Sequence, residues 1–325
     1  MGDMVAFQNS NFLINKNREN HYMSYRLSSK NPIDVRSSDS QTIQPKIKIF
    51  FVVEGAETES IYLNSFISKF EKNAIGDFII LDRLDRTKSH QKAVTKQIQD
   101  FLNSCSGLKD KQISILKNTK ELLNNPQLDK KNLQKILNNL KKSKIPQSVL
   151  DLISIEKPND RLLHLYALES IIVLKRYEKD FDKVCILIDR DKQSFKEEQY
   201  DDVIKICEEN NFLLGISNPS FELFLFLHFS DLLGYDHEKI LDNKKVSKSK
   251  SSPKFMEKLL KEYLQNNLSL SFNKNSFDAD KFVLEFDKVP QNIISSNLST
   301  CILELKNTIG TSVYNVLDPL IERVE

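Results

Sequence analysis

Short apolar runs alternate with amphipathic segments through the middle of the chain. KIKIFFVVEG, which starts at Lys46, is β-branched and aromatic and ends in glycine, so it predicts a strand. DFIILDRLD, DKVCILIDRD and FLLGISNPS predict three further strands. Between the strands, TESIYLNSFISKF, HQKAVTKQIQDFLNS and EQYDDVIKICEENN repeat apolar residues at helical spacing, and Thr58 is the expected N-cap of the first helix. Strands separated by helices predict a parallel α/β sheet.

The regions outside this alternation divide the chain further. Residues 106–160 repeat Leu and Ile at three- and four-residue steps, which predicts short helices joined at Pro126 and Pro146. RLLHLYALESIIVLKRYEKD predicts a long helix, and FELFLFLHF is expected to be a helix rather than a strand because a cap-like Ser-Asn-Pro-Ser precedes it. We therefore expect a polar tail at 1–44, the two parts of the core at 45–104 and 166–235, a helical insertion at 105–165, and a basic loop with a C-terminal helical region at 236–325.

Composition excludes several classes of protein. The 325 residues are 40% hydrophobic, which is enough for a substantial core, and the formal net charge of +2 does not by itself indicate nucleic-acid binding. Only 7 glycines occur and none form a phosphate-binding loop, which argues against a P-loop ATPase or a dinucleotide-binding dehydrogenase. Four cysteines without CxxC spacing argue against a zinc site and a disulfide framework. No 18-residue apolar stretch or signal-peptide core is present, so we expect a cytoplasmic protein without membrane contact.

Acidic residues stand at the ends of two predicted strands. The first strand ends at Glu54, and the third ends at Asp189-Arg190-Asp191, 135 residues later. Parallel strands place their carboxyl ends at one edge of the sheet, where α/β folds bind ligands. Alternation along an extended segment would send Asp189 and Asp191 to the same side. Crowded carboxylates are relieved by a divalent cation, and hard oxygen ligands favour Mg²⁺ or Mn²⁺. Helix capping by the same acidic residues is an alternative that spacing alone leaves open.

Three segments of the chain resemble one protein family. VVEGAETESIYLNSF, LIDRD and SNPSFELFLFLHF occur in the order seen in the RloB, or AbiLii-like, family of bacterial Toprim-related proteins. The family pattern reads approximately EGxxTExxYF, DRD and SNPxFExWxxxHF, and the resemblance covers about 46–103 and 181–285. Leu63 replaces a usual aromatic residue and Phe224 a usual tryptophan, which are conservative packing changes. The helical insertion separates the first two blocks more widely than the family pattern.

The resemblance implies a fold and a function. It implies a Toprim-like parallel sheet flanked by helices, with Glu54 as a general acid or base or a metal ligand and with Asp189 and Asp191 holding the metal. The implied activity is a Mg²⁺- or Mn²⁺-dependent nuclease of antiphage defence that acts on RNA, such as tRNA, or on DNA together with a partner ATPase. The alternative is a non-catalytic module that senses a nucleic acid, a nucleotide or the ATPase. Self-association into a homo-oligomer is left open.

Other residues are weaker candidates for the same site. Glu222 could be a further metal ligand, although a favourable helix dipole explains it equally well, and the dipole is the better explanation for Glu59. Lys274, in a segment similar to a Tyr/Phe-x-Lys element of the family, could supply a catalytic cation. His228 is expected to have a hydrogen-bonded core role. The candidate substrate-binding residues are Arg83, Arg86, Arg190, Asn218, Lys244, Lys245, Lys248 and Lys250. The four lysines could contact phosphates or belong to a solvated linker.

Overall fold

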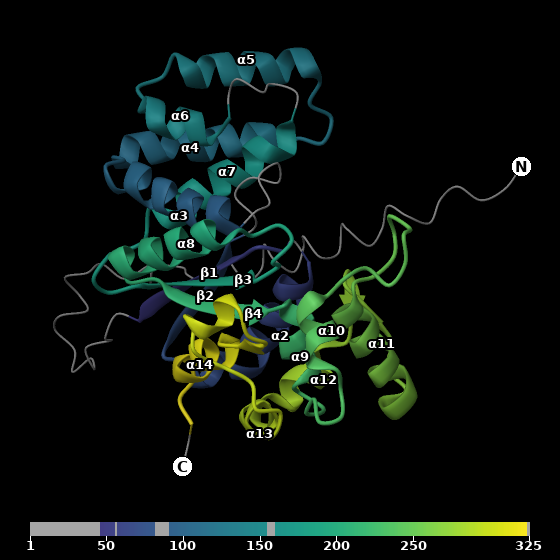
Figure 1. Cartoon of the computed structure of the whole chain (residues 1–325). Coiled ribbons are helices and arrows are strands. Elements are labelled where there is room, and N and C mark those ends of the chain that lie inside the picture. The colour runs from purple at the N-terminus through teal and green to yellow at the C-terminus, as the bar shows by residue number, and fades with distance from the viewer. Residues whose placement is uncertain (1–45, 56, 82–90, 155–159, 324–325) are drawn as a thin grey trace, which may run out of the picture. The chain divides into compact units, whose positions relative to one another are not determined.

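The chain folds around a five-stranded sheet (Figure 1). A computed structural model describes residues 46–55, 57–81, 91–154 and 160–323. The strand order is β2-β1-β3-β4-β7, in which the first four strands are parallel and β7 is antiparallel to β4. The strands are β1 (Ile47–Val53), β2 (Gly76–Leu81), β3 (Lys183–Asp189), β4 (Leu213–Asn218) and β7 (Gly310–Thr311). The predicted parallel α/β sheet is thereby confirmed, whereas the two-residue strand β7 was too short to be recognised from the sequence.

The central strands are apolar along their whole length because both faces of the sheet are covered. Phe50 and Val52 of β1 pack on one face, and Phe51 and Val53 pack on the other. In a parallel sheet buried on both faces, period-two alternation disappears and the strand becomes a continuous apolar run. KIKIFFVVEG has this composition.

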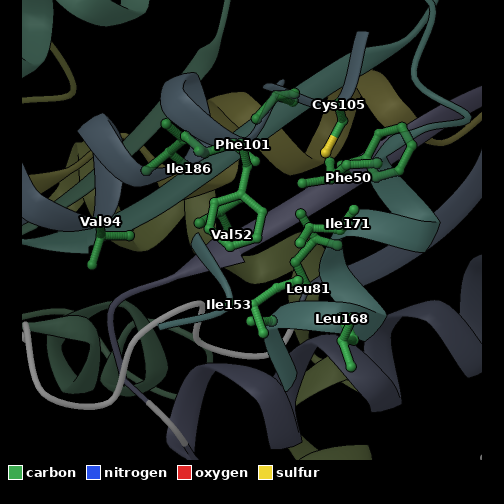
Figure 2. Close-up of a cluster of buried hydrophobic side chains, with 14 of the residues drawn as sticks. Phe50, Val52, Leu81, Val94, Phe101, Cys105, Ile153, Leu168, Ile171 and Ile186 are labelled. Atoms are coloured by element: carbon green, nitrogen blue, oxygen red, sulfur yellow. The ribbon is translucent and has the colours of Figure 1, made fainter. Parts of the chain in front are cut away.

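Three helices cover the first face. Figure 2 shows Val94 and Phe101 of α3 and Leu168 and Ile171 of α7 among the side chains that surround Val52. Helix α8 packs on the same cluster. The helices of this face are α3 (Gln91–Ser106), α7 (Arg161–Leu174) and α8 (Glu197–Asn210). The long helix predicted in RLLHLYALESIIVLKRYEKD is α7. It is shorter than expected because the chain turns after Leu174.

The segment between α3 and α7 is helical, as its sequence predicts. Pro126 separates its first two helices, and Pro146 is the N-cap residue of the third. Leu133, Leu137 and Leu140 form the buried stripe of the middle helix. Figure 1 shows these helices stacked beyond α3 and α7, away from the sheet. They are α4 (Asp110–Leu123), α5 (Lys130–Lys141) and α6 (Gln147–Leu152).

The C-terminal part of the chain covers the second face together with α2 and α9. The predicted helix in FELFLFLHF is α9, which ends at Phe226. Within the described part of the chain, none of the helices has the length and apolar character required to cross a bilayer. The helices of this layer are α2 (Thr58–Phe70), α9 (Phe221–Phe226), α10 (His237–Asp242), α11 (Phe255–Leu268), α12 (Ala279–Leu284), α13 (Val289–Ser295) and α14 (Val313–Leu317).

The expected N-cap of α2 was wrong. Glu57 is the N-cap residue and makes no capping hydrogen bond with its side chain, and Thr58 is the first helical residue. The Thr58 hydroxyl instead donates a hydrogen bond to the backbone carbonyl of Lys274, with an Oγ1–O distance of 3.2 Å. A long-range partner thus replaces the local capping bond that the sequence suggests.

His228 links two of the segments that carry the family resemblance. Its Nδ1 lies 2.9 Å from the carbonyl oxygen of Phe224, and its Nε2 lies 2.9 Å from the hydroxyl of Tyr62. The carbonyl can only accept, so Nδ1 carries the proton and Nε2 accepts from Tyr62. The imidazole is fully buried. His228 is therefore a core residue, as expected.

Burial of His228 predicts a pH-dependent loss of stability. Desolvation lowers the pKa of His228 to about 3, below its ordinary value of 6.5, so stability is present above pH 6.5 and declines as pH falls toward 3. Between pH 7 and pH 5 this histidine should remove about 2 kcal/mol of unfolding free energy. His228→Gln keeps a donor and an acceptor, and urea unfolding should show its stability falling by about 2 kcal/mol less over this interval. An equal decline in both proteins would contradict this assignment.

Candidate active site at the carboxyl edge of the sheet

Two carboxylates from distant parts of the sequence meet at the carboxyl edge of the sheet. Glu54 directly follows β1, and Asp189 is the last residue of the adjacent strand β3. The Asp189 backbone N–H donates to Glu54 Oε2 at 3.1 Å, and the Glu54 backbone N–H donates to the Leu187 carbonyl at 3.1 Å. Strand pairing therefore brings these two predicted site residues together.

A glutamine that the sequence did not single out orients Glu54. Gln91 Nε2 donates to Glu54 Oε1 at 2.9 Å. The Gln91 side chain is at the start of α3 and has no solvent exposure. Its Oε1 has no hydrogen-bond partner among the residues that the structure describes. Because Asp189 and Gln91 each donate to one oxygen, both oxygens of the Glu54 carboxylate are fixed in position.

Asp189 lies in a strongly negative environment. Its Oδ1 accepts a hydrogen bond from the backbone N–H of Phe221, the first residue of α9, at 2.8 Å. Burial raises the pKa of Asp189 well above its usual range, and repulsion from Glu54, Glu59 and Glu222 adds to this effect. Lys274 opposes the shift. Among the described residues, three carboxylates and one lysine therefore act on the charge of Asp189.

Glu59 belongs to this group of carboxylates, although the sequence favoured a helix-dipole role for it. It lies in the first turn of α2 and is buried. Burial raises the pKa of Glu59. A hydrogen bond from its own backbone N–H lowers the pKa, and repulsion from Glu222 raises it further. Its carboxylate lies against Gly55, where any side chain would collide with it. The Glu-Gly-x-x-Thr-Glu spacing was the available signal, because it lets the second glutamate fold back over the glycine.

Lys274 brings a positive charge to the carboxylates from far along the sequence. It lies in the tight turn between β5 (Phe272–Asn273) and β6 (Ser276–Phe277). Its Nζ lies 2.5 Å from Glu222 Oε1 and 3.5 Å from Glu257 Oε2. Burial of Glu222 favours protonation, but the ion pair with Lys274 outweighs it and lowers the pKa of Glu222. The predicted residues Glu222 and Lys274 are therefore direct partners.

Asp191 faces a different set of partners. Strand β3 ends at Asp189, so the alternation that was expected to orient both aspartates does not extend to Asp191. Asp191 Oδ2 lies 2.7 Å from Lys254 Nζ and accepts from Ser194 Oγ at 3.0 Å. Although burial acts in the opposite direction, these hydrogen bonds and the positive charge of Lys254 lower the pKa of Asp191.

Two residues expected to bind substrate have structural partners instead. The buried Arg190 guanidinium donates to the carbonyls of Lys306 at 3.0 Å and Phe195 at 2.5 Å, and it stacks near Tyr200. The buried Asn218 amide donates to the carbonyls of Leu305 and Thr308, each at 2.8 Å. These bonds to backbone carbonyls give both side chains a structural role, and substrate binding by them stays a prediction.

The structure describes four of the six remaining substrate-binding candidates. Arg83 and Arg86 lie outside the described residues. The four lysine candidates lie on an exposed hairpin between α10 and α11: Lys244, Lys245, Lys248 and Lys250.

The candidate metal ligands at this edge are carboxylate oxygens, which are the ligands that Mg²⁺ and Mn²⁺ prefer. Among the described residues, no three or more His, Cys, Asp and Glu side chains converge as a complete metal-binding group. A cation held by Glu54 and Asp189 would therefore be completed by water and phosphate oxygens, as is common for Mg²⁺. The carboxylates that act on Asp189 within the described part of the chain fit such a cation.

Comparison with known proteins identifies a family for this chain. A family model described as RloB-like protein matches residues 49–316 of the chain. No curated protein and no solved structure shows significant similarity to it. The matched range contains β1 from residue 49 onward, together with β3, α9 and the hairpin that carries Lys274.

Proposed function

The chain belongs to the RloB-like protein family, and from this premise we propose that it is a Mg²⁺-dependent nuclease of antiphage defence. In this proposal it cleaves phosphodiester bonds of RNA or DNA at the carboxyl edge of its sheet. A partner ATPase, which the family resemblance suggests, controls the activity.

One observation carries the proposal. Glu54 and Asp189 are in contact although 135 residues separate them, and Asp189 is surrounded by further carboxylates. Placing like charges together lowers stability, so a fold retains such a group where it has a function. Phosphodiester cleavage requires positive charge beside the reacting phosphate, and a carboxylate site that takes up a divalent cation provides it.

Glu54 and Asp189 would be the principal ligands of the cation. Glu222, whose charge acts on Asp189, could assist if it exchanged its lysine partner, whereas Asp191 is paired with Lys254. A bound Mg²⁺ would supply positive charge to the phosphate oxygens and lower the pKa of coordinated water.

The other residues orient the reacting groups. Gln91 and the Asp189 backbone hold both oxygens of the Glu54 carboxylate in position at the edge of the sheet. Lys274, which touches Glu222, would place a protein cation near the departing oxygen. The site therefore combines a fixed acceptor with a nearby cation.

A cleavage assay tests the proposal. Purified protein, with and without the ATPase encoded beside its gene, would be incubated with RNA and DNA pools and Mg²⁺ or Mn²⁺. We expect cleavage that falls by at least about 10³-fold in Glu54→Gln. Asp180→Asn is a matched control, because Asp180 is an exposed acidic residue just before the opposite end of β3. Its activity should equal that of the wild type. Cleavage that persists in Glu54→Gln would contradict the proposal.

A second candidate function is a non-catalytic sensor of nucleic acid, nucleotide or ATPase. The ion pairs of Lys254 with Asp191 and of Lys274 with Glu222 favour it, because they neutralise part of the carboxylate charge without a metal. The sensor predicts nucleic-acid binding that is unchanged in Glu54→Gln, without cleavage under any of the conditions above.

A further inference from the structure

The connection between α10 and α11 concentrates positive charge on an exposed surface. Residues 244–254, which we call the lysine hairpin, contain five lysines and no acidic residue. Residues 244–251 are exposed. Positive charge in this density is an electrostatic signature of contact with a polyanion.

The lysine hairpin is a hydrogen-bonded ribbon. The Val246 N–H donates to the Pro253 carbonyl, and the Phe255 N–H donates to the Lys244 carbonyl, each at 3.0 Å. The Ser252 hydroxyl accepts from the Ser247 N–H at 2.9 Å. Figure 1 shows this connection projecting away from α10 and α11. Hydrogen bonds within the hairpin thus hold its backbone, which distinguishes it from a flexible linker.

The base of the lysine hairpin is attached to the candidate active site. Lys254, at its C-terminal end, forms the 2.7 Å ion pair with Asp191. Gln193 Nε2 also donates to the Asp242 carbonyl at 3.3 Å, just before the hairpin. Asp191 is two residues from Asp189, so the ribbon begins beside the carboxylate edge and leads away from it.

The charges toward the tip are the ones available to a ligand. Lys244 pairs with Asp242 at 2.7 Å, and Lys254 pairs with Asp191. Lys245, Lys248 and Lys250 form no ion pair with any described residue. The chain turns through residues 246–251, and Lys245 Nζ donates to the Lys250 carbonyl at 2.7 Å, so the three lysines are gathered on one compact loop.

We propose that the lysine hairpin is a docking surface for the phosphodiester backbone of a nucleic acid. It would hold that backbone next to the bond at the carboxylate edge; this last placement rests on the proposed function, whereas docking does not. The hairpin has no aromatic residue on which bases could stack, so it recognises the polymer backbone and not the sequence. A mononucleotide, which spans only one phosphate position, gains little from it.

Salt-dependent binding tests the proposal. The full chain in EDTA would be titrated against labelled 20-nucleotide single-stranded RNA, single-stranded DNA, duplex DNA and a mononucleotide, between 50 and 200 mM salt, by fluorescence anisotropy. The test variant is Lys245→Gln/Lys248→Gln/Lys250→Gln. The control is Lys130→Gln/Lys131→Gln/Lys135→Gln, which removes three exposed lysines from the start of α5.

We expect the test variant to bind the preferred polymer at least tenfold more weakly than the wild type at low salt. The slope of log affinity against log salt should fall by about 2 for a single strand or about 3 for a duplex, since each lost phosphate contact removes about 0.7 or 0.9. The control should match the wild type. Which polymer shows the effect identifies the substrate class.

Three results would overturn the proposal: an unchanged slope in the test variant, an equal loss in the control, or wild-type protein that binds anionic lipid vesicles and no nucleic acid. The outcome is separable from that of the cleavage assay. Loss of binding in the test variant together with no cleavage by the wild type supports docking and contradicts the nuclease. Cleavage by the wild type together with an unchanged salt slope in the test variant supports the nuclease and contradicts docking.

Discussion

Replacing Asp189 with asparagine is expected to abolish cleavage and, in the absence of divalent cations, to make the protein more stable. Asparagine keeps an oxygen that can accept the Phe221 N–H, now made by Asp189 Oδ1 at 2.8 Å. It removes the charge that Glu54, Glu59 and Glu222 repel. The activity should fall by at least about 10³-fold, because the variant loses a cation ligand.

The stability gain has a defined pH dependence. The pKa of Asp189 is raised in the folded protein, so its ionisation costs stability as pH rises above the ordinary value of 3.8. In EDTA at pH 7 the variant should melt about 2–4 °C higher than the wild type, equivalent to about 1 kcal/mol. The difference should shrink toward pH 4. Differential scanning fluorimetry measures it, with Asp180→Asn as the control. A lower melting temperature for Asp189→Asn at pH 7 would show that the carboxylates do not repel one another as described.

Removing Lys274 should have the largest effect on stability. Lys274→Met leaves the buried Glu222 without its 2.5 Å partner. Breaking a buried ion pair typically costs about 3–5 kcal/mol. We expect about 2–3 kcal/mol at pH 7, because the Lys274 side chain is 39% exposed and solvent screens part of the interaction.

Titration of Glu222 gives this prediction a second signature. Lys274 lowers the pKa of Glu222, so the stabilisation by the pair is present above the ordinary glutamate value of 4.5 and is lost as pH falls through the lowered value. Without Lys274, protonation of Glu222 should restore stability near pH 4. Urea unfolding at pH 7 and pH 4 measures this change.

Two comparisons isolate the role of the pair. Lys274→Met/Glu222→Gln should recover most of the loss at pH 7. Lys258→Met, which removes an exposed ion pair with Glu262 on α11, should cost at most about 0.5 kcal/mol. An equal cost of Lys274→Met at both pH values, or no recovery in the double variant, would mean that Lys274 acts through packing and not through charge.

The sheet could be predicted from the sequence because its signals are local. β1 and β3 are short apolar runs, and the segments between them have helical spacing. The N-cap of α2 could not be predicted in the same way. Threonine is a common N-cap residue, but the Thr58 hydroxyl donates to the backbone carbonyl of Lys274, 216 residues away. A contact over such a distance has no local pattern in one sequence.

The candidate site was predictable to the extent that strand ends define it. Glu54 and Asp189 follow from the rule that parallel strands end at one edge. Asp191 lies past the strand end, where alternation no longer determines direction. Gln91 follows a segment without a recognisable motif, so no signal in the sequence pointed to its contact with Glu54. Arg190 was a candidate because phosphoryl chemistry needs a cation near the carboxylates, but its side chain is buried and bonds to backbone carbonyls.

Titration of the purified protein with Mn²⁺ or Mg²⁺ by isothermal calorimetry tests the central assignment without requiring activity. We expect the wild type and Asp180→Asn to bind the cation, and both Glu54→Gln and Asp189→Asn to lose at least tenfold in affinity for it. Wild-type protein that binds neither cation, or variants that bind as tightly as the wild type, would contradict the assignment of Glu54 and Asp189 as the cation site.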